Sequence, residues 1–224
     1  MTDNLSVFIS RAFEKEINKN MLYYNYDFPY EIVKDYVDKI LSIPVDALVN
    51  QAIISPTLMA IEAKDVFQFS DFDAGSIRIC TKLINVGNPG VTYLEAGKLL
   101  LDDGISRKEG AYTKYGENHL KLSESLGLTH ELTRTYFISC IGMIYPDLSE
   151  ENQKRLLTRL LLRNKFVIRL IKAADKGNVN LRQFLYMLSE STYVRRRSNV
   201  KYILNILKMS DEYDFNYIIN NITL

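Results

Sequence analysis

The chain has 224 residues, of which 47% are hydrophobic and 25% are charged, and its formal net charge is +1. These proportions are typical of a globular protein with a sizeable core and exclude an intrinsically disordered chain. No run of about 18 uncharged apolar residues occurs, so we expect no membrane span. With two widely separated cysteines and no apolar signal-peptide core at the start, we expect a cytoplasmic protein.

The charges are distributed unevenly along the chain. Residues 151–224 contain fourteen Lys and Arg against six Asp and Glu, whereas residues 1–75 contain six against twelve. The near-neutral total therefore conceals an acidic first third and a basic last third. A basic module of this kind indicates a polyanionic partner, most often a nucleic acid.

Residues 1–88 predict an acidic helical domain. Apolar residues recur at helical spacing over 8–17 and 32–41, and Ser55-Pro56 is a helix-start signal. Residues 55–86 repeat a weak two-helix pattern, so this domain could be a degenerate winged helix. The run Gly-Asn-Pro-Gly at 87–90 is a strong breaker and marks the expected end of the domain.

Residues 89–148 predict a winged-helix module. A short helix is expected over 91–101, a second helix within 112–128, and a β-rich wing around 135–138. A helix followed by a β-wing is a common DNA-binding arrangement. The expected DNA-facing side chains are Thr113, Lys114, Tyr115, Asn118 and Lys121. The alternative is a core helix whose polar face is simply solvated.

Residues 149–224 predict a basic winged-helix module. We expect one long helix from Glu151 to about Ala174, ended by Gly177-Asn178. Asn180 should cap a short helix, and Ser189 or Ser191 should cap a final helix that runs to Lys208. The fold class is therefore mostly α with small β wings, arranged as two to three tandem winged-helix-like modules.

The final helix has the pattern of a DNA-reading helix. Val200, Ile203, Leu204 and Leu207 form one apolar stripe, and the turns before it are rich in arginine. A helix-turn-helix protein packs its second helix by one face and presents the first turns to the major groove. Arginine can bind guanine or clamp phosphate, and asparagine can bind adenine. The expected DNA-binding residues are Ser191, Thr192, Arg195, Arg196, Arg197, Asn199 and Lys201. The alternative is a solvated helix face, which is the usual fate of a charge run.

The runs TKYGENHLKLSESLGL and STYVRRRSNVKYILNIL, with the segment between them, resemble tandem winged-helix modules of bacteria that accompany restriction–modification and related defence genes. The resemblance covers about residues 110–208. It implies DNA binding in a defence or regulatory context but no reaction. The tryptophan that such modules often carry in the last helix is absent, and Tyr202 stands near that place. The matching positions are Thr113, Lys114, Gly116, Asn118, His119, Ser191, Thr192, Arg195, Arg196, Ser198 and Val200.

One catalytic pattern requires consideration. Asp46 in Pro-x-Asp, followed by Glu62 and Lys64 in Glu-x-Lys, resembles the core of PD-(D/E)xK nucleases, which hold Mg²⁺ between two acidic side chains on strand ends. However, the sequence around Glu62 favours a helix. The two histidines lack zinc-site spacing, and no phosphate-binding glycine motif occurs. We therefore expect no cofactor or metal unless the nuclease interpretation holds, and we expect His119 to be a helix-surface residue or a cap.

The main expectation is thus a protein that binds double-stranded DNA with its basic module. The acidic residues 1–88 could serve as a scaffold, a homodimer surface or a partner-binding face. A third interpretation is a helical adaptor in which the basic helices meet an acidic protein and no nucleic acid is involved.

Overall fold

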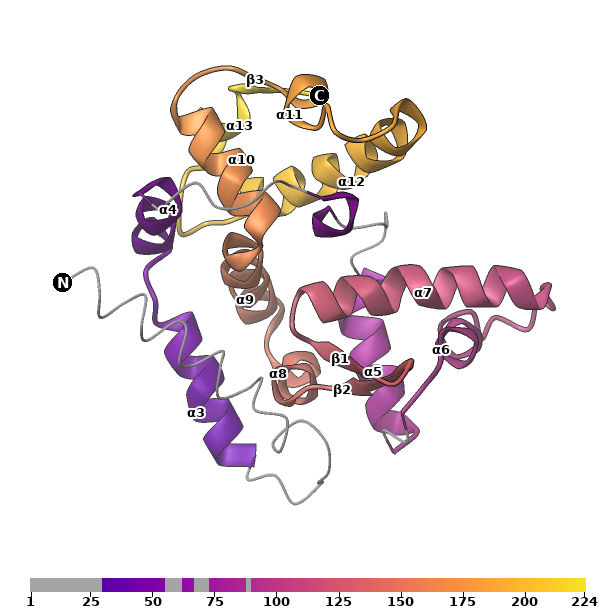
Figure 1. Ribbon diagram of the computed structural model, residues 1–224. Helices are drawn as coiled ribbons and strands as arrows, with labels where there is room; N and C mark the ends of the chain where they lie inside the picture. Colours follow the sequence, from indigo (N-terminus) through magenta and orange to yellow (C-terminus); the bar gives the residue numbers. More distant parts are fainter. Residues whose placement is uncertain (1–29, 55–61, 67–72, 88–89) are drawn as a thin grey trace. The chain divides into compact units, whose positions relative to one another are not determined.

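The computed structural model describes residues 30–54, 62–66, 73–87 and 90–224, which are mostly helical with two small two-stranded sheets (Figure 1). They divide into two compact units. The central unit contains residues 30–38 and 73–149, and the carboxy-terminal unit contains residues 39–54, 62–66 and 150–224. The helix expected over 8–17 and the start signal at Ser55-Pro56 lie outside the described residues. In the described residues, the chain passes between the units at 38–39 and at 149–150.

The central unit combines short helices with one hairpin. Its longest helix, α7, packs closely against α6, and both begin at residues with extended backbone, Lys108 and Thr92. Thr92 and Glu95 form a reciprocal capping box, which satisfies backbone donors at the start of α6. In chain order the elements are α3 (Tyr30–Leu41), which extends into the other unit, the π-helix η2 (Ala74–Arg78), α5 (Ile79–Asn85), α6 (Tyr93–Leu100), α7 (Glu109–Ser125), β1 (Thr129–Leu132), β2 (Thr135–Ile138), α8 (Cys140–Ile144) and the 3₁₀ helix η3 (Tyr145–Asp147).

The hairpin β1–β2 is antiparallel, with Thr129 opposite Ile138 and Leu132 opposite Thr135. Its two-residue turn, Thr133-Arg134, has φ angles of 50° and 65°, as expected for the tight turn whose twist suits a hairpin. Val91 pairs with Tyr136 through two backbone hydrogen bonds of 2.8 Å. Val91, which precedes the Thr92 cap of α6, therefore adds a third backbone segment beside β2, although the sequence predicted helix there.

Two glycines set the distance between α6 and α7. A Cβ atom added at Gly116 would lie 2.7 Å from the Gly97 backbone nitrogen and would overlap the Tyr93 carbonyl oxygen. A Cβ atom at Gly97 would in turn overlap the carbonyl oxygen of Tyr112. The backbones of α6 and α7 thus touch directly, which requires residues without a side chain at both positions.

The carboxy-terminal unit is built on buried aliphatic side chains. α4 packs against α9 and α10, and α12 packs against α9 and α13. The strands β3 and β4 pair in parallel, with Val179 opposite Ile222. The elements are α4 (Val45–Ile54), the 3₁₀ helix η1 (Ala63–Asp65), α9 (Glu150–Arg163), α10 (Lys165–Asp175), β3 (Val179–Asn180), α11 (Leu181–Phe184), α12 (Glu190–Lys208), α13 (Asn216–Ile219) and β4 (Ile222–Thr223).

The single helix predicted from Glu151 to about Ala174 is wrong. The chain turns at Asn164, whose side-chain oxygen accepts hydrogen bonds from the backbone of Phe166 and Val167 and so caps a new helix, α10. An asparagine within a run of good helix formers can compete for backbone donors in this way. The caps predicted at Asn180 and Ser189 are confirmed.

A buried arginine joins α9 to distant backbone within the same unit. Arg159 donates from Nε and Nη2 to the Ile43 carbonyl oxygen at 3.1 and 2.9 Å, and from Nη2 to Glu212 at 2.8 Å. Arg155 also donates to Glu212, at 3.1 Å. The hydrogen bonds from Arg159 lower the pKa of the Glu212 carboxyl to about 2, although burial opposes the shift. Two of the four cations of α9, Arg155 and Arg159, therefore form contacts within the unit.

Both cysteines are buried free thiols, as expected from their apolar surroundings in the sequence, and burial raises the pKa of Cys80. The prediction that His119 lies on a helix surface is wrong. His119 is buried, and its ring centroid lies 4.3 Å from that of Tyr115, one turn earlier on α7.

Candidate nucleic-acid interface

Helix α12 presents a buried apolar face and an exposed polar face. Its start is fixed by Ser189, whose side-chain oxygen accepts a hydrogen bond from the Thr192 backbone nitrogen at 3.3 Å. The predicted apolar stripe is confirmed, because its four members are all buried, and Tyr193 joins them. The packing of this stripe fixes which residues of the helix can reach a partner.

The three consecutive arginines do not share one environment. Arg195 and Arg197 are exposed, whereas Arg196 is only 6% exposed. Arg196 precedes Val200 by one helical turn, so its side chain enters the buried stripe. Burial, reinforced by the charge of Arg195, lowers the pKa of the Arg196 guanidinium to about 10, and its Nε atom has no hydrogen-bond partner. An arginine in this environment is poorly placed to grip phosphate.

The remaining predicted residues of α12 also separate by exposure. Asn199, proposed as an adenine reader, is only 5% exposed. Ser191 and Lys201 are exposed, and Thr192 is partly exposed. The Arg195 side chain lies back along the helix, because its Nε atom donates to the Ser191 carbonyl oxygen at 3.2 Å. Of the seven residues expected here, four are exposed: Ser191, Arg195, Arg197 and Lys201.

The exposed face of α12 is basic and carries no compensating acid. Four cations lie on it: Arg195, Arg197, Lys201 and Lys208. In the described part of the chain, no carboxylate forms an ion pair with any of these four side chains. Glu190, the one acidic residue of the helix, pairs instead with Arg182 at 2.9 Å. We call these four cations the α12 basic face.

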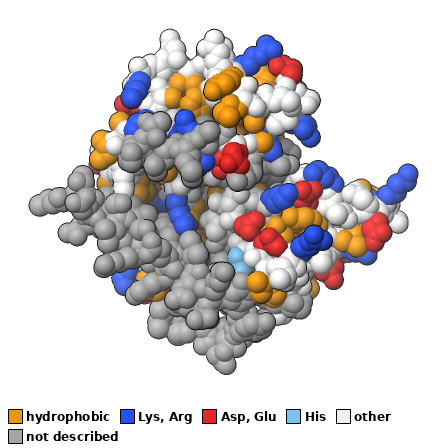
Figure 2. Space-filling model, viewed as in Figure 1, with side chains coloured by type: hydrophobic (Ala, Val, Ile, Leu, Met, Phe, Trp, Pro, Cys, Tyr) orange, Lys and Arg blue, Asp and Glu red, His pale blue; other side chains and the backbone are white. Residues whose placement is uncertain are grey.

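The predicted DNA-facing residues of α7 have a different electrostatic environment. Glu117 accepts from Lys114 at 2.8 Å and from Lys121 at 2.6 Å, so both lysines are paired within the helix. Burial alone would raise the pKa of Glu117, but these hydrogen bonds lower it below its ordinary value. Figure 2 accordingly shows acidic and basic side chains side by side over α6 and α7.

The other three residues expected on α7 face local partners or are partly covered. The Thr113 hydroxyl donates to the Glu109 carbonyl oxygen at 3.0 Å, and the Tyr115 ring contacts His119. Asn118 is half-buried. The charge on α7 is thus balanced internally, and this helix offers a weaker attraction for phosphate than α12 does.

The residues of the nuclease alternative do not occupy strand ends. Asp46 is exposed in the first turn of α4, and Glu62 is exposed at the start of η1. The side chain of Lys64 lies outside the described part. Across residues 30–54, 62–66, 73–87 and 90–224, no cluster of three metal-ligating His, Cys, Asp or Glu side chains occurs. Within the described residues, neither Asp46 nor Glu62 lies on a β-strand.

Sequence reasoning missed two features of this surface. Lys208 follows Lys201 by two helical turns and shares its exposed side, a relation that spacing alone could have revealed. Glu117 stands three residues after Lys114 and four before Lys121, which is ion-pair spacing on a helix. Both signals are present in the sequence as helical spacings.

Every helix in the described residues is too short or too polar to span a membrane. Comparisons of the chain with protein-family models, with curated proteins and with solved structures found no match. The functional assignment must therefore come from the geometry and charge of the chain itself.

Proposed function

We propose that the carboxy-terminal unit binds double-stranded DNA through the α12 basic face. The observation that carries this proposal is the presence of four exposed cations along the two edges of the solvent-exposed face of a long helix, with no acidic partner among the described residues. Duplex DNA supplies closely spaced phosphates, and each neutralised phosphate releases condensed counterions. The opposite side of α12 is buried, so the helix is held rigidly while this face remains accessible.

The positions of the cations around α12 suit a helix lying in a groove. At about 100° per residue, Ser191 and Ser198 fall near the middle of the exposed face. Arg195 lies toward one edge of this face, and Arg197 and Lys201 lie toward the other. A helix in the major groove, which is about 12 Å wide, has a phosphate backbone on each side. Cations at both edges could therefore contact both strands, with small side chains between them.

The order of elements supports a helix-turn-helix arrangement for this unit. The short helix α11 is followed by residues 185–189 and then by α12, whose first turns hold two of the four cations. In proteins of this class the second helix enters the major groove with its amino-terminal residues. The resemblance to bacterial defence-associated modules points to the same class and suggests a defence or regulatory setting.

The central unit has the element order of a winged helix: α5, the paired segment at Val91, α6, α7 and the hairpin β1–β2. We propose that it is a second winged-helix module whose contribution to phosphate binding is small. The reason is that Lys114 and Lys121 both pair with Glu117, and that the three glutamates and two lysines of α7 leave the helix without net positive charge. Such a module could instead position the carboxy-terminal unit or contact a protein partner.

The test compares two variants with the same change in net charge. One carries Arg195→Ala, Arg197→Ala and Lys201→Ala. The control carries Lys34→Ala, Lys98→Ala and Lys108→Ala, three exposed lysines of the central unit. Fluorescence anisotropy with a labelled 30-base-pair duplex, at about 0.1 M salt, gives the affinity. We expect the first variant to lose at least about tenfold in affinity, and the control to lose much less.

Circular dichroism establishes that both variants remain folded. Equal affinities for the wild type and the α12 variant would refute the proposal, as would an equal loss in the control. If the folded wild-type protein shows no affinity for duplex DNA at this salt concentration, the basic face is better explained by an acidic protein partner.

A further inference from the structure

Helix α12 carries an apolar side chain on its exposed side, among the residues of the α12 basic face. Val194 is 55% exposed and stands in the second turn of the helix. It lies about 120° around the helix axis from Val200, which is fully buried in the apolar stripe. The isopropyl group of Val194 therefore points away from the core of the carboxy-terminal unit and toward any partner that covers this face.

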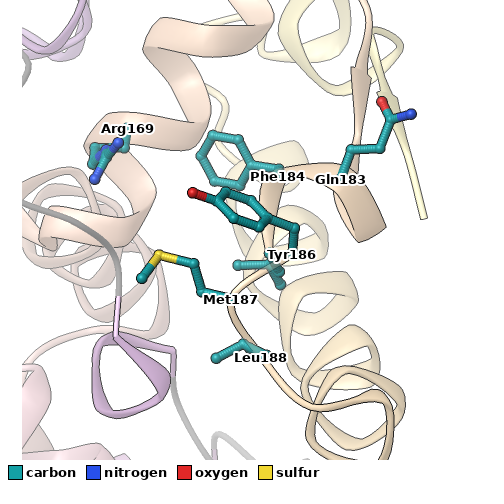
Figure 3. A pocket seen from close by; sticks show the side chains of 7 residues that line it. Arg169, Gln183, Phe184, Tyr186, Met187 and Leu188 are labelled. Atoms are coloured by element: carbon teal, nitrogen blue, oxygen red, sulfur yellow. The ribbon is translucent and has the colours of Figure 1, made fainter.

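The exposed apolar side chains of the preceding turn belong to a different surface. Tyr186 and Met187 line a pocket of about 340 Å³, together with the rest of residues 183–188 and with Arg169 of α10 (Figure 3). Figure 3 shows the Tyr186 hydroxyl and the Met187 side chain turned toward the side on which Arg169 lies. The described residues that line this pocket include none from α12. Val194 is thus the exposed apolar group that the first turns of α12 themselves present to a partner.

The neighbours of Val194 on this face are small or cationic. Ser191 and Ser198 lie about 40–60° from it around the helix axis, one turn before it and one turn after it. Arg197 and Lys201 lie on its other side, toward the edge of the face. The serines leave room for a close approach, and the cations attract a polyanion to this surface. Val194 therefore lies near the line along which the helix and a bound duplex come closest.

The fold itself gains little from a valine at this position. A β-branched side chain loses rotamer freedom in a helix, and valine has a lower helix propensity than alanine, lysine or arginine. More than half of the Val194 surface remains in water, so full burial does not offset this loss. A partner with an apolar group at the matching place would remove that surface from water and supply a favourable contact.

The major groove of duplex DNA contains one such group. Each thymine projects its C5-methyl group into the groove, whereas the other base edges present hydrogen-bond donors and acceptors there. The amino-terminal turns of a groove-entering helix are the ones that contact base edges. We propose that Val194 contacts a thymine C5-methyl group and so gives the α12 basic face a preference for A·T base pairs. This inference rests on the proposed DNA binding by α12, and it adds a residue that selects among sequences.

The experiment removes the methyl group from the DNA and changes nothing else in its formula. One probe is a labelled 30-base-pair duplex of AAT repeats, and the other has the same sequence with deoxyuridine in place of every thymidine. The two duplexes share their phosphates and all their base-pairing groups. In anisotropy titrations at about 0.1 M salt, we expect the wild-type protein to bind the thymine duplex about threefold to fivefold more tightly, which is the effect of burying about one methyl group.

Two variants locate the preference. Val194→Ser should bind the two duplexes with equal affinity, because the isopropyl group that contacts the methyl group is gone. Val86→Ser removes another exposed valine, at the end of α5 in the central unit, and should keep the wild-type ratio of affinities. An effect of the methyl group on the shape of the duplex would act on both variants alike, so their comparison separates it from a contact with Val194. Circular dichroism verifies that both variants are folded.

The outcomes separate this inference from the proposed function. Equal affinity of the wild-type protein for the two duplexes would overturn the contact with thymine and leave the proposed phosphate binding intact. An unchanged ratio in Val194→Ser would do the same. The wild-type comparison decides this even if Val194→Ser fails to fold. Absence of binding to either duplex would instead refute the proposed function, and this inference with it.

Discussion

Replacing Gly116 with alanine tests the close approach of α6 and α7. The added Cβ atom would lie 2.7 Å from the Gly97 backbone nitrogen, whereas ordinary contact begins at 3.4 Å, and it would overlap the Tyr93 carbonyl oxygen. The obstructing atoms belong to backbone and cannot change rotamer. The two helices would have to move apart by more than about half an ångström, and the interior would lose its close packing.

The expected cost follows from two opposing contributions. Overpacking costs about 1–3 kcal/mol, and the upper end applies because backbone is displaced. The gain in helix propensity from glycine to alanine offsets up to about 1 kcal/mol. We therefore expect Gly116→Ala to lower the free energy of unfolding by about 2 kcal/mol. For a chain of this size, that lowers the Tm by about 4–8 °C.

Gly110→Ala is the matched control, because Gly110 lies in the first turn of the same helix and a Cβ atom there meets nothing within 4 Å. It should raise the free energy of unfolding by about 0.5–1 kcal/mol. Thermal and urea unfolding followed by circular dichroism measure both variants. The two effects should have opposite signs. Stabilisation by Gly116→Ala would show that the helices do not touch as described.

Three further predictions concern charge. Arg196→Met should keep or raise the free energy of unfolding, by up to about 2 kcal/mol, because it removes a buried cation whose Nε atom is unsatisfied. In anisotropy titrations this variant should bind the duplex with unchanged affinity. A loss of affinity equal to that of Arg197→Ala would contradict the burial of Arg196. Glu212 has a depressed pKa in the folded protein, so its stabilising pairing with Arg159 is fully present above the ordinary pKa of 4.5 and is lost as the pH falls toward about 2. Over that pH range, the urea concentration at the unfolding midpoint should fall less steeply for Glu212→Gln than for the wild type. Parallel pH profiles for the two proteins would exclude the pairing. Replacing both Lys114 and Lys121 with alanine should lower duplex affinity no more than the central-unit control, and a tenfold loss would place α7 on the DNA.

Local sequence signals predicted the elements that are decided locally. Ser189 and the apolar spacing of 200–207 correctly defined α12, and Asn180 correctly marked the start of α11. The break between α9 and α10 also depends on a local signal, the cap at Asn164. In a strongly helical run, however, the helix propensity of the neighbouring residues easily outweighs such a cap in a prediction. Val91 could not have been assigned from its surroundings, since its conformation depends on Tyr136, which is forty-five residues away.

Part of the candidate interface was predictable because it depends on the spacing of residues within single helices. Helical periodicity distinguishes Arg196 from Arg195 and Arg197, because Arg196 aligns with Val200 on the buried side. The pairing of Glu117 with two lysines also follows from spacing alone. The pocket beside Tyr186 does not, because it is formed when α10 brings Arg169 to a turn that follows it in sequence. Only the tertiary structure places a cation next to those exposed apolar side chains.

The salt dependence of duplex binding tests the central claim most directly. The slope of log K against log [NaCl] counts the phosphates neutralised, at about 0.9 per contact. Loss of Arg195, Arg197 and Lys201 should make the slope shallower by about 2.7, whereas the variant lacking Lys34, Lys98 and Lys108 should keep the wild-type slope. Identical slopes for the wild type and the α12 variant would show that this face of the helix does not contact DNA.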